Sequence, residues 1–497
     1  MHIVLASSEI APFSKSGGLG DVTGALGAPL VARGHRVLTV SPGYRSVDRA
    51  RWGFGEVSDA VRIHLGDGPH DVRFSHTQRD GVHHLLVEHP MYDRDGLYGD
   101  SHGAFRDNHL RYALLSRAAI EAARRVPVGG SPLGQDVLFH CNDWQTGLLP
   151  VYLDALYRPL GLFPRAATVL TMHNPAHQGR LPGSLFADLD LSPRWFGPSG
   201  VEWYGDLGLL KGGLVHADEL TTVSPTFARD VTTPDGGFGL DGLLRLRKSR
   251  LTGILNGIDP VEWDPEADPH LDAAFSAEDL AGKAVCKRAL QRELGLPDDP
   301  DAAIVGSVGR LDPQKGIELL IESIPWLVAQ GAQVVVLGSA AAAHRHYEDQ
   351  LRALERRFPH RVRAWVGFSE RVAHRVEAGS DLFAMPSLFE PCGLNQMYSQ
   401  RYGTLPVVRR TGGLTDSVKP FDRTGDAGTG FLFDAPTGHA LRGALWQGLD
   451  LFRTDRAAFD RARKRAMRVD WSWARAIPKY ESVYRRAAER RGLLDAG

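Results

Sequence analysis

Short apolar runs recur along the whole chain, and a helix-length segment separates most of them. In the first half they occupy residues 2–7, 36–40, 137–140, 168–172 and 219–223, and in the second half residues 302–308, 333–337, 362–366, 381–385 and 405–408. A parallel strand that is buried on both faces is apolar throughout and needs a crossover helix to reach the next strand. The pattern predicts an α/β fold in which helices cover both faces of parallel sheets.

A change of texture divides the chain into two halves. The sequence Asn-Gly-Ile-Asp-Pro at residues 256–260 indicates a turn, and the following forty residues are rich in Asp, Pro and Ala. A length of 497 residues suits two large domains. We therefore predict an N-terminal Rossmann-like domain over residues 1–255 and a second over 256–475. The aromatic residues Trp471, Tyr480 and Tyr484 predict a packed amphipathic helix near the C-terminus.

Charge and composition exclude several classes of protein. Lys plus Arg number 58 and Asp plus Glu 59, so no net positive charge collects the phosphates of a nucleic acid. No apolar run reaches about 18 residues and no secretory leader is visible, so we expect neither a membrane span nor secretion. The three cysteines are too few for a disulfide framework, which favours a reduced, cytoplasmic location.

A glycine-rich turn follows the first predicted strand. Residues 15–21 read Lys-Ser-Gly-Gly-Leu-Gly-Asp, and a helix is predicted over 21–32. Backbone N–H groups at such a turn, with the positive end of a helix dipole, favour an anion, and Lys15 adds a positive charge. The turn is equally compatible with a plain strand-to-helix connection. It lacks the G-x-G-x-x-G order of a dinucleotide site, which argues against a nicotinamide-dependent dehydrogenase.

Two charged clusters follow predicted strands of the second half. Arg310 and Lys315 come directly after the strand at 302–308, where open α/β sheets bind ligands. Two cations there suit a diphosphate, although a solvated surface loop is an alternative. Glu390 lies between the strand at 381–385 and a glycine-started helix. Its carboxylate suits two sugar hydroxyls or, alternatively, the backbone donors of the helix N-terminus.

These clusters belong to an ordered set of motifs that extends from the first strand to about residue 436. The set comprises KSGGLGDV at 15–22, TMHN at 171–174, TTVSP at 221–225, NGID at 256–259, GRL and QKG within 309–316, EPCGL at 390–394 and RTGGL at 410–414. Together they resemble bacterial glycogen synthases and plant starch synthases. The whole set is far more specific than any single motif.

The resemblance implies a fold and a reaction. The fold would be of the GT-B type, with two doubly wound Rossmann-like domains facing a central cleft and a C-terminal helix, residues 476–497, returning to the first domain. The enzyme would transfer glucose from ADP-glucose to the non-reducing end of an α-1,4-glucan such as glycogen, with retention of configuration. It would need neither metal nor cofactor. Displacement on one face of the sugar is favoured, and a double displacement through a carboxylate stays open.

The resemblance also implies roles for individual residues. Six residues would act in catalysis: Lys15 on the distal phosphate, Arg310 and Lys315 on the leaving diphosphate, Glu390 on the glucosyl hydroxyls, His173 through its carbonyl at the anomeric carbon, and Asp143 near the acceptor. The residues expected to bind substrate are Gly17, Gly18, Asp21, Asn174, Asn256, Phe368, Cys392, Gly393, Leu394, Thr411 and Gly412.

Three positions leave alternatives open. The family usually has histidines where this chain has Asn142 and Gln145, which motivates a glucan-binding protein with reduced or lost transferase activity. A related enzyme that uses UDP-glucose is another alternative. Phe368 follows the predicted strand at 362–366 and is expected either to stack on the purine of ADP or to fill the core as an ordinary aromatic residue.

Overall fold

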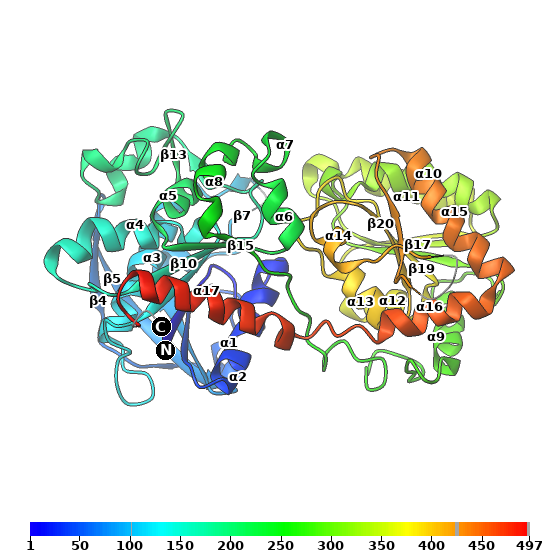
Figure 1. Ribbon diagram of the computed structural model, residues 1–497, viewed down its shortest axis with the longest axis horizontal. Helices are drawn as coiled ribbons and strands as arrows, with labels where there is room; N and C mark the ends of the chain where they lie inside the picture. Colours follow the sequence, from blue (N-terminus) through cyan, green and yellow to red (C-terminus); the bar gives the residue numbers. More distant parts are fainter. Residues whose placement is uncertain (101, 423–426, 495–497) are drawn as a thin grey trace. The chain divides into compact units, whose positions relative to one another are not determined.

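The chain folds into two compact units (Figure 1). The computed structural model describes residues 1–100, 102–422 and 427–494. Unit 1 consists of Met1–Val223, Ala228–Asn256 and Trp473–Gly497, and unit 2 consists of Ser224–Phe227 and Gly257–Ser472. Apart from the four residues Ser224–Phe227, the chain passes from unit 1 to unit 2 after Asn256 and returns after Ser472.

Unit 2 is built on a six-stranded parallel sheet. Its strands are β16 (Ile304–Val308), β17 (Gln333–Gly338), β18 (Val362–Val366), β19 (Leu382–Met385), β20 (Leu405–Arg409) and β21 (Phe431–Phe433). Their order is β18-β17-β16-β19-β20-β21, and every pairing is parallel. Numbered within the unit, this order is 3-2-1-4-5-6, that of a doubly wound Rossmann fold. The five strands predicted in this half are confirmed.

Helices cover both faces of this sheet. They are α9 (Ala281–Glu293), α10 (Ile317–Ala329), α11 (His346–Arg357), α12 (Glu370–Gly379), α13 (Asn395–Arg401), α14 (Gly412–Ser417), α15 (Gly438–Thr454) and α16 (Arg456–Met467). Successive residues of a strand face opposite sides. Val334 and Val336 of β17 accordingly join the core beneath α10, α11 and α15, whereas Val335 and Leu337 join the core beneath α9 and α12.

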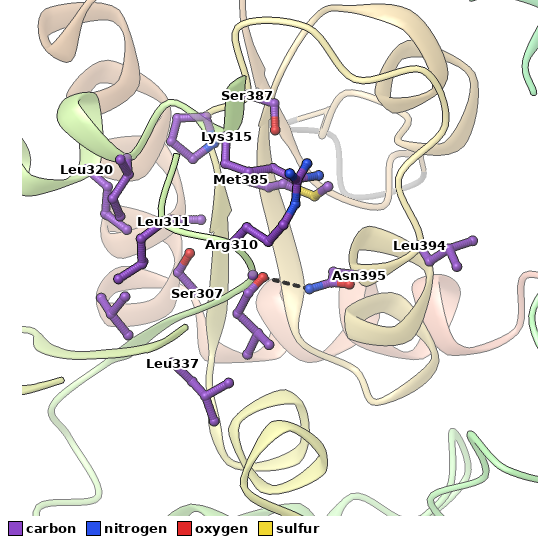
Figure 2. A pocket seen from close by; sticks show the side chains of 16 residues that line it. Ser307, Arg310, Leu311, Lys315, Leu320, Leu337, Met385, Ser387, Leu394 and Asn395 are labelled. Carbon is purple, nitrogen blue, oxygen red and sulfur yellow. Dashed lines mark hydrogen bonds between the residues drawn. The ribbon is translucent and has the colours of Figure 1, made fainter. Parts of the chain in front are cut away.

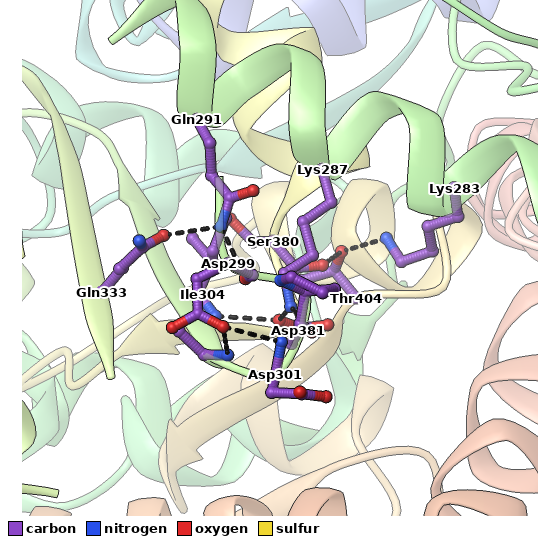
Figure 3. Close-up of polar contacts among 12 residues, drawn as sticks. Lys283, Lys287, Gln291, Asp299, Asp301, Ile304, Gln333, Ser380, Asp381 and Thr404 are labelled. Atoms are coloured by element: carbon purple, nitrogen blue, oxygen red, sulfur yellow. Dashed lines mark hydrogen bonds and ion pairs between the residues drawn. The ribbon is translucent and has the colours of Figure 1, made fainter. Parts of the chain in front are cut away.

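A buried ionic network holds unit 2 together (Figure 3). The carboxylate of Asp381, which precedes β19, lies 2.9 Å from Lys287 Nζ of α9 and accepts a hydrogen bond from Arg463 of α16. It also accepts the backbone N–H of Ile304, at 2.8 Å. Burial alone would raise the pKa of Asp381, but Lys287 and Arg463 outweigh it and lower the pKa. The network therefore fastens two helices to the start of two central strands.

The central part of the unit 1 sheet has the same winding. Its parallel strands are β1 (His2–Ala6), β2 (Arg36–Pro42), β6 (Val82–Glu88), β9 (Leu138–Asn142), β10 (Ala167–Met172), β14 (Glu219–Thr222) and β15 (Leu251–Gly253). Their order is β15-β14-β10-β9-β1-β2-β6, so the central pair is again the first and fourth strands. The five strands predicted here are confirmed, with ends shifted by a residue or two.

One edge of this sheet departs from the prediction. An all-parallel sheet was expected, but β5 (Gly68–Arg79) runs antiparallel to β6, and it also pairs with β3 (Gly55–Glu56) and β4 (Val61–Leu65). Asp80 and Gly81, with φ of 48° and 77°, make the two-residue turn between β5 and β6. An Asp-Gly pair with positive φ at both residues is typical of tight hairpins, so the sequence did contain a signal for this edge.

Helices α1 (Gly18–Ala32) and α17 (Ile477–Arg490) share one core of unit 1. The helix α1 begins at Gly18, three residues before the predicted start. The aromatic residues of α17 are buried against the sheet, and the Tyr484 hydroxyl lies 2.8 Å from Nδ1 of His140 on β9. The C-terminal helix thus belongs to the N-terminal fold (Figure 1).

The remaining elements are short, apart from one long helix. They are α2 (Arg49–Trp52), α3 (Asn108–Arg125), α4 (Leu148–Tyr152), α5 (Leu209–His216), α6 (Pro225–Asp230), α7 (Pro234–Gly237), α8 (Asp241–Leu246), β7 (Gly99–Asp100), β8 (Gly103–Ala104), β11 (Arg180–Leu181), β12 (Glu202–Trp203) and β13 (Asp206–Gly208). None of the helices in the described ranges combines the length and apolar character that crossing a bilayer requires.

Candidate active site

The predicted site residues of unit 2 gather at its topological switch point. The first and fourth strands, β16 and β19, are neighbours in the sheet, and the chain leaves them toward opposite faces. Loops at the carboxyl ends of such a pair diverge and leave a crevice, where open α/β folds bind ligands. The loop at 309–316 follows β16, and the loop at 386–394 follows β19.

Two cations line a small cavity at this crevice. It has a volume of about 90 Å³, and its lining includes Arg310, Lys315, Ser387 and Leu394 (Figure 2). Arg310 Nη1 lies 3.1 Å from Asp312 Oδ2, and 58% of the arginine side chain remains exposed. The Nδ2 group of Asn395 donates to the carbonyl of Val308, at 2.7 Å, which ties the two loops together. An anion that enters the cavity therefore meets positive charge from two side chains.

Glu390 is buried beside this cavity. One of its carboxylate oxygens, Oε2, lies 2.6 Å from Lys315 Nζ and accepts a hydrogen bond from Ser387 Oγ at 3.0 Å. The ion pair joins the two loops of the switch point, because Lys315 follows β16 and Glu390 follows β19. The carboxylate thus already has side-chain partners and a fixed position.

The RTGGL segment packs directly on the Glu390 loop. The backbone N–H of Gly413 donates to the Glu390 carbonyl at 3.0 Å. A Cβ on Gly412 would lie 2.1 Å from that same oxygen, and Gly412 has a φ of 44°. Only glycine permits this approach, which brings Thr411, at the start of α14, to the loop that contains Cys392.

Unit 1 places the glycine-rich turn at its own switch point. The turn follows β1, whose neighbour β9 is the fourth strand in the winding order. Lys15 Nζ lies 2.6 Å from Asp21 Oδ1, in an ion pair that remains accessible to solvent. The two residues that sequence analysis assigns to phosphate and substrate are therefore partners in this structure.

The sequence analysis missed the buried carboxylate beneath this turn. Glu9 accepts hydrogen bonds from the N–H and, at 2.7 Å, the hydroxyl of Ser16, and its Oε2 accepts the Gly17 N–H at 3.3 Å. The Tyr98 hydroxyl donates to the same carboxylate. In this structure Glu9 thus holds a backbone donor, that of Gly17, which the prediction assigned to phosphate.

Asp143 and His173 meet at the ends of β9 and β10. The Asp143 carboxylate accepts the backbone N–H of His173 at 2.6 Å and that of Asn174. Asp143 has φ of 56° and ψ of −170°, a conformation that non-glycine residues rarely adopt and that costs roughly 1–3 kcal/mol. This strained residue fixes the turn that carries His173.

Burial perturbs both side chains. It raises the pKa of Asp143 to about 7, against the two backbone hydrogen bonds that favour the ionised form. It lowers the pKa of His173 to about 3, so the imidazole is neutral near pH 7. The His173 Nε2–H donates to Asn142 Oδ1 at 2.9 Å, which sets the ring orientation.

The structure also places three other predicted residues. Phe368 is 83% exposed, so the alternative that it fills the core is wrong. Asn174 Oδ1 accepts the Ala176 N–H at 3.1 Å and shapes the turn after His173. Asn256 is buried at the end of unit 1, and its Oδ1 has no hydrogen-bond partner in the described part of the chain.

Comparison with known proteins connects these sites to a family. The family model "Starch synthase catalytic domain" matches residues 2–246, and "Glycosyl transferases group 1" matches residues 289–465. A glycogen synthase of Anaeromyxobacter dehalogenans is 46% identical over 98% of this chain and 99% of its own. Soluble starch synthase 1 of Solanum tuberosum is 42% identical over 97% of this chain and 78% of its own. The chain belongs to the glycogen synthase and starch synthase family.

Solved structures agree with this assignment. The catalytic domain of starch synthase IV from Arabidopsis thaliana, bound to ADP and acarbose, superposes with a TM-score of 0.89 at 33% identity, covering 98% of this chain and 99% of its own. A sucrose-phosphate synthase from Thermosynechococcus elongatus, at 16% identity and a TM-score of 0.60, shares the fold. This chain is therefore a glycosyltransferase of glucan synthesis with a fold of the GT-B type, and it uses a nucleotide-sugar donor and a glucan acceptor.

This glucan synthase has an aromatic cavity that sequence analysis did not find. The cavity lies in unit 1, has a volume of about 610 Å³ and is lined by aromatic residues, namely Tyr98, Phe105, Trp144, Trp203, Tyr204 and Phe238. Tyr204 is 76% exposed at the tight turn between β12 and β13, and its ring lies 4.6 Å from that of Trp203. An adjacent Trp-Tyr pair before a glycine was the available signal, since such a turn exposes aromatic faces.

The two departures from the family pattern lie inside this synthase. Asn142 is fully buried, and its side chain bonds to His173 and to the carbonyl of Ala6. Gln145 is also buried, and its Oε1 has no hydrogen-bond partner among the residues described. Asn142 thus orients the imidazole of His173 through their hydrogen bond.

The pH dependence of this enzyme is expected to report Asp143. Because its pKa is about 7 and its ionised form accepts the two N–H groups of the His173 turn, kcat/KM for glucan should rise as pH increases through 7. His173 and His140, with pKa values of about 3, stay neutral and contribute nothing to this change. The measurement is kcat/KM between pH 5.5 and 8.5 for wild type and Asp143→Asn.

The variant should lose the rise near pH 7, because its amide does not ionise. Asp188→Asn is the matched control, since Asp188 is a partly exposed carboxylate of the same unit that pairs with His109. An unchanged inflection in Asp143→Asn would contradict the assignment.

Proposed function

We propose that this glycosyltransferase transfers glucose from ADP-glucose to the non-reducing end of an α-1,4-glucan such as glycogen, with retention of configuration, in the cytoplasm. The observation that carries the proposal is the unit 2 switch point, where Arg310 and Lys315 line one cavity and Lys315 pairs with Glu390. This crevice thus contains two cations that suit a diphosphate. It also contains a carboxylate that suits sugar hydroxyls.

The cations would act on the leaving group. Cleavage of the glycosidic bond leaves negative charge on the diphosphate and positive charge at the anomeric carbon. Arg310 and Lys315 are held in place by Asp312 and Glu390, so they stabilise the departing charge without first reorganising. Lys15, with the Gly17–Gly18 turn of unit 1, is proposed to contact the distal phosphate, for which Lys15 would exchange its partner Asp21.

The glucosyl unit would be held by Glu390 and the backbone of residues 392–394. Lys315 Nζ holds the Glu390 carboxylate at one oxygen, and we propose that this carboxylate accepts two glucosyl hydroxyls. The carbonyl of His173 is proposed to face the anomeric carbon, because Asp143 fixes its backbone and the imidazole stays neutral. Further contacts with substrate are proposed for five residues, namely Asp21, Asn174, Asn256, Thr411 and Gly412.

The acceptor glucan is assigned to the aromatic cavity of unit 1. The C–H faces of glucose rings would pack on the exposed ring of Tyr204 and the partly exposed ring of Trp203. Trp144, the residue that follows Asp143 in the chain, is one of the residues that line this cavity. An aromatic surface of this kind suits a linear glucan chain.

ADP-glucose is expected to be the better donor. Phe368 is exposed in the loop after β18 and offers its ring to a base, and adenine has the larger π face. The test is incorporation of labelled glucose into glycogen from ADP-glucose and from UDP-glucose, measured as kcat/KM in wild type and in Phe368→Ala. The variant should lose activity mainly with ADP-glucose, by about fivefold, which corresponds to the loss of a stacking contact of roughly 1 kcal/mol.

Three outcomes would contradict parts of this proposal. A wild-type preference for UDP-glucose would overturn the donor, and equal losses for both donors in Phe368→Ala would overturn the stacking contact alone. Binding of glycogen without transfer from either donor would favour the glucan-binding protein that Asn142 and Gln145 motivated. Trp446→Ala is a matched control, since Trp446 is an exposed aromatic residue on α15 of the same unit, outside the loops of the proposed site.

Removal of divalent metal is expected to leave transfer unchanged. Lys15, Arg310 and Lys315 supply the positive charges that a metal ion supplies in metal-dependent transferases. The measurement is the initial rate with ADP-glucose and glycogen before and after dialysis against EDTA. A loss of rate that Mg²⁺ or Mn²⁺ restores would show that these side chains do not suffice.

A further inference from the structure

We propose that His270, Glu370 and His374 of unit 2 form a binding site for one divalent transition-metal ion, of which Zn²⁺ is the best fit. One ligand atom from each side chain lies within 4.8 Å of the other two. The three residues come from a loop and from the first turns of α12, and none of them belongs to the proposed transfer site. The site is structural in this proposal.

The strongest support comes from His374. The imidazole is almost fully buried, and its Nδ1–H donates to Asp268 Oδ2 at 2.7 Å. The other ring nitrogen, Nε2, is buried and has no hydrogen-bond partner in the described part of the protein. A buried nitrogen without a partner costs about 1–3 kcal/mol, so a ligand for it is favourable. Metal-binding histidines usually donate their second nitrogen to a carboxylate in this way.

The surroundings hold this imidazole in one orientation. Trp263 stacks on the ring at a centroid distance of 3.9 Å and an interplanar angle of 11°. The Tyr402 hydroxyl donates to the same Asp268 oxygen at 2.6 Å and so fixes the carboxylate. The buried imidazole is therefore already oriented, and metal binding would need little free energy to align it.

The other two ligands come from two different segments of the chain. Glu370 and His374 are four residues apart on α12, so they share one face of the helix. His270 belongs to the loop before α9, and the carbonyl of His270 accepts a hydrogen bond from Arg375 Nε at 2.9 Å. One ion would thus link the start of α12 to a loop about a hundred residues earlier in the chain.

The ligand set favours Zn²⁺. Two imidazole nitrogens and one carboxylate are a common zinc set, in which water takes the fourth tetrahedral position. When each zinc–ligand bond is about 2.0–2.1 Å long, two tetrahedral ligand atoms lie about 3.3 Å apart. Each pair of ligand atoms would therefore have to approach by about 1.5 Å at most from the separations of up to 4.8 Å seen here. Glu370 is exposed and His270 is partly exposed, which leaves both free to make this adjustment.

Neighbouring positive charge does not block the site. Two arginines of the same helix, Arg371 and Arg375, pair with Glu293 of α9. Arg375 Nη1 lies 2.5 Å from Glu293 Oε2. Arg375 also lies 3.2 Å from Asp272. Their charges are compensated by carboxylates, so a divalent ion beside them is not opposed by two free cations.

Metal binding can be tested directly with Co²⁺ and Zn²⁺ as probes. Full-length protein is dialysed against EDTA and then titrated with Co²⁺, whose tetrahedral nitrogen and oxygen complexes absorb in the visible range, and with Zn²⁺ by calorimetry. We expect one equivalent to bind, and we expect Zn²⁺ to raise Tm. Glu370→Gln and His270→Ala should each weaken binding at least tenfold and abolish the rise in Tm.

Two controls make the outcome decisive. His346→Ala removes a histidine from the His344–His346 pair on the same unit and should leave binding unchanged. Transfer activity of Glu370→Gln without added metal should equal that of wild type, which shows that the variant is folded. The proposal is overturned if no ion binds, if Glu370→Gln and His270→Ala bind as tightly as wild type, or if His346→Ala abolishes binding. None of these results bears on ADP-glucose as donor.

Discussion

Replacing Arg310 by alanine is expected to lower kcat about 10²–10³-fold with little change in the KM for glycogen. Arg310 lies at the cavity of the unit 2 switch point, where its guanidinium is held by Asp312 and faces the proposed diphosphate. Its charge matters most when the leaving group becomes fully anionic, so the loss falls on the transition state. Steady-state kinetics with ADP-glucose and glycogen measure the effect.

Charge and geometry can be separated in this experiment. Arg310→Lys keeps the charge but loses the two-pronged donor, so we expect an intermediate kcat. Arg352→Ala is the matched control, because Arg352 is a half-exposed arginine on α11 of the same unit. Near-normal turnover in Arg310→Ala would remove this residue from the mechanism, whatever its effect on stability.

Replacing Asp381 by alanine is expected to lower the free energy of unfolding by about 3–5 kcal/mol. The change leaves Lys287 and Arg463 buried without their shared carboxylate and removes the acceptor of the Ile304 N–H. Buried charges that lose their partner retain their desolvation penalty. Urea unfolding followed by circular dichroism measures the difference, and Asp349→Ala, at an exposed pair on α11, should stay within about 0.5 kcal/mol of wild type.

The same network predicts a pH dependence. The folded protein lowers the pKa of Asp381. The stabilisation that Asp381 gives to the fold is therefore fully present above its pKa in the unfolded chain, about 3.9, and is lost as pH falls through its pKa in the folded protein. The difference in free energy of unfolding between wild type and Asp381→Ala should therefore decrease below about pH 4. A difference that stays constant down to pH 2.5 would mean that the fold does not lower the pKa of Asp381.

Much of this protein could be predicted from local patterns. All ten expected strands exist, because a strand buried on both faces must be apolar along its whole length. The charged clusters were placed correctly at the carboxyl ends of strands, since Gly and Pro mark where strands stop. The motifs were sufficient to indicate the family that the comparisons then showed. Each of these signals lies within a few consecutive residues.

Contacts between distant segments could not be predicted. Tyr98 reaches Glu9 across 89 residues, and Lys315 reaches Glu390 across 75, only because the sheets bring their loops together. The aromatic cavity of unit 1 collects residues from several separate loops, and its lining depends on how those loops pack.

The amino-acid sequence by itself determined the alternation of the parallel strands with helices, the ends of those strands to within a residue or two, and the chemical type of the loops that follow them, because these depend on local burial and backbone preference. Only the tertiary structure decided which loops meet, as at His270 and His374, and which carboxylates are buried or paired. The physical reason is that strand order and side-chain packing act over long separations in the chain. No local pattern of residues encodes those separations.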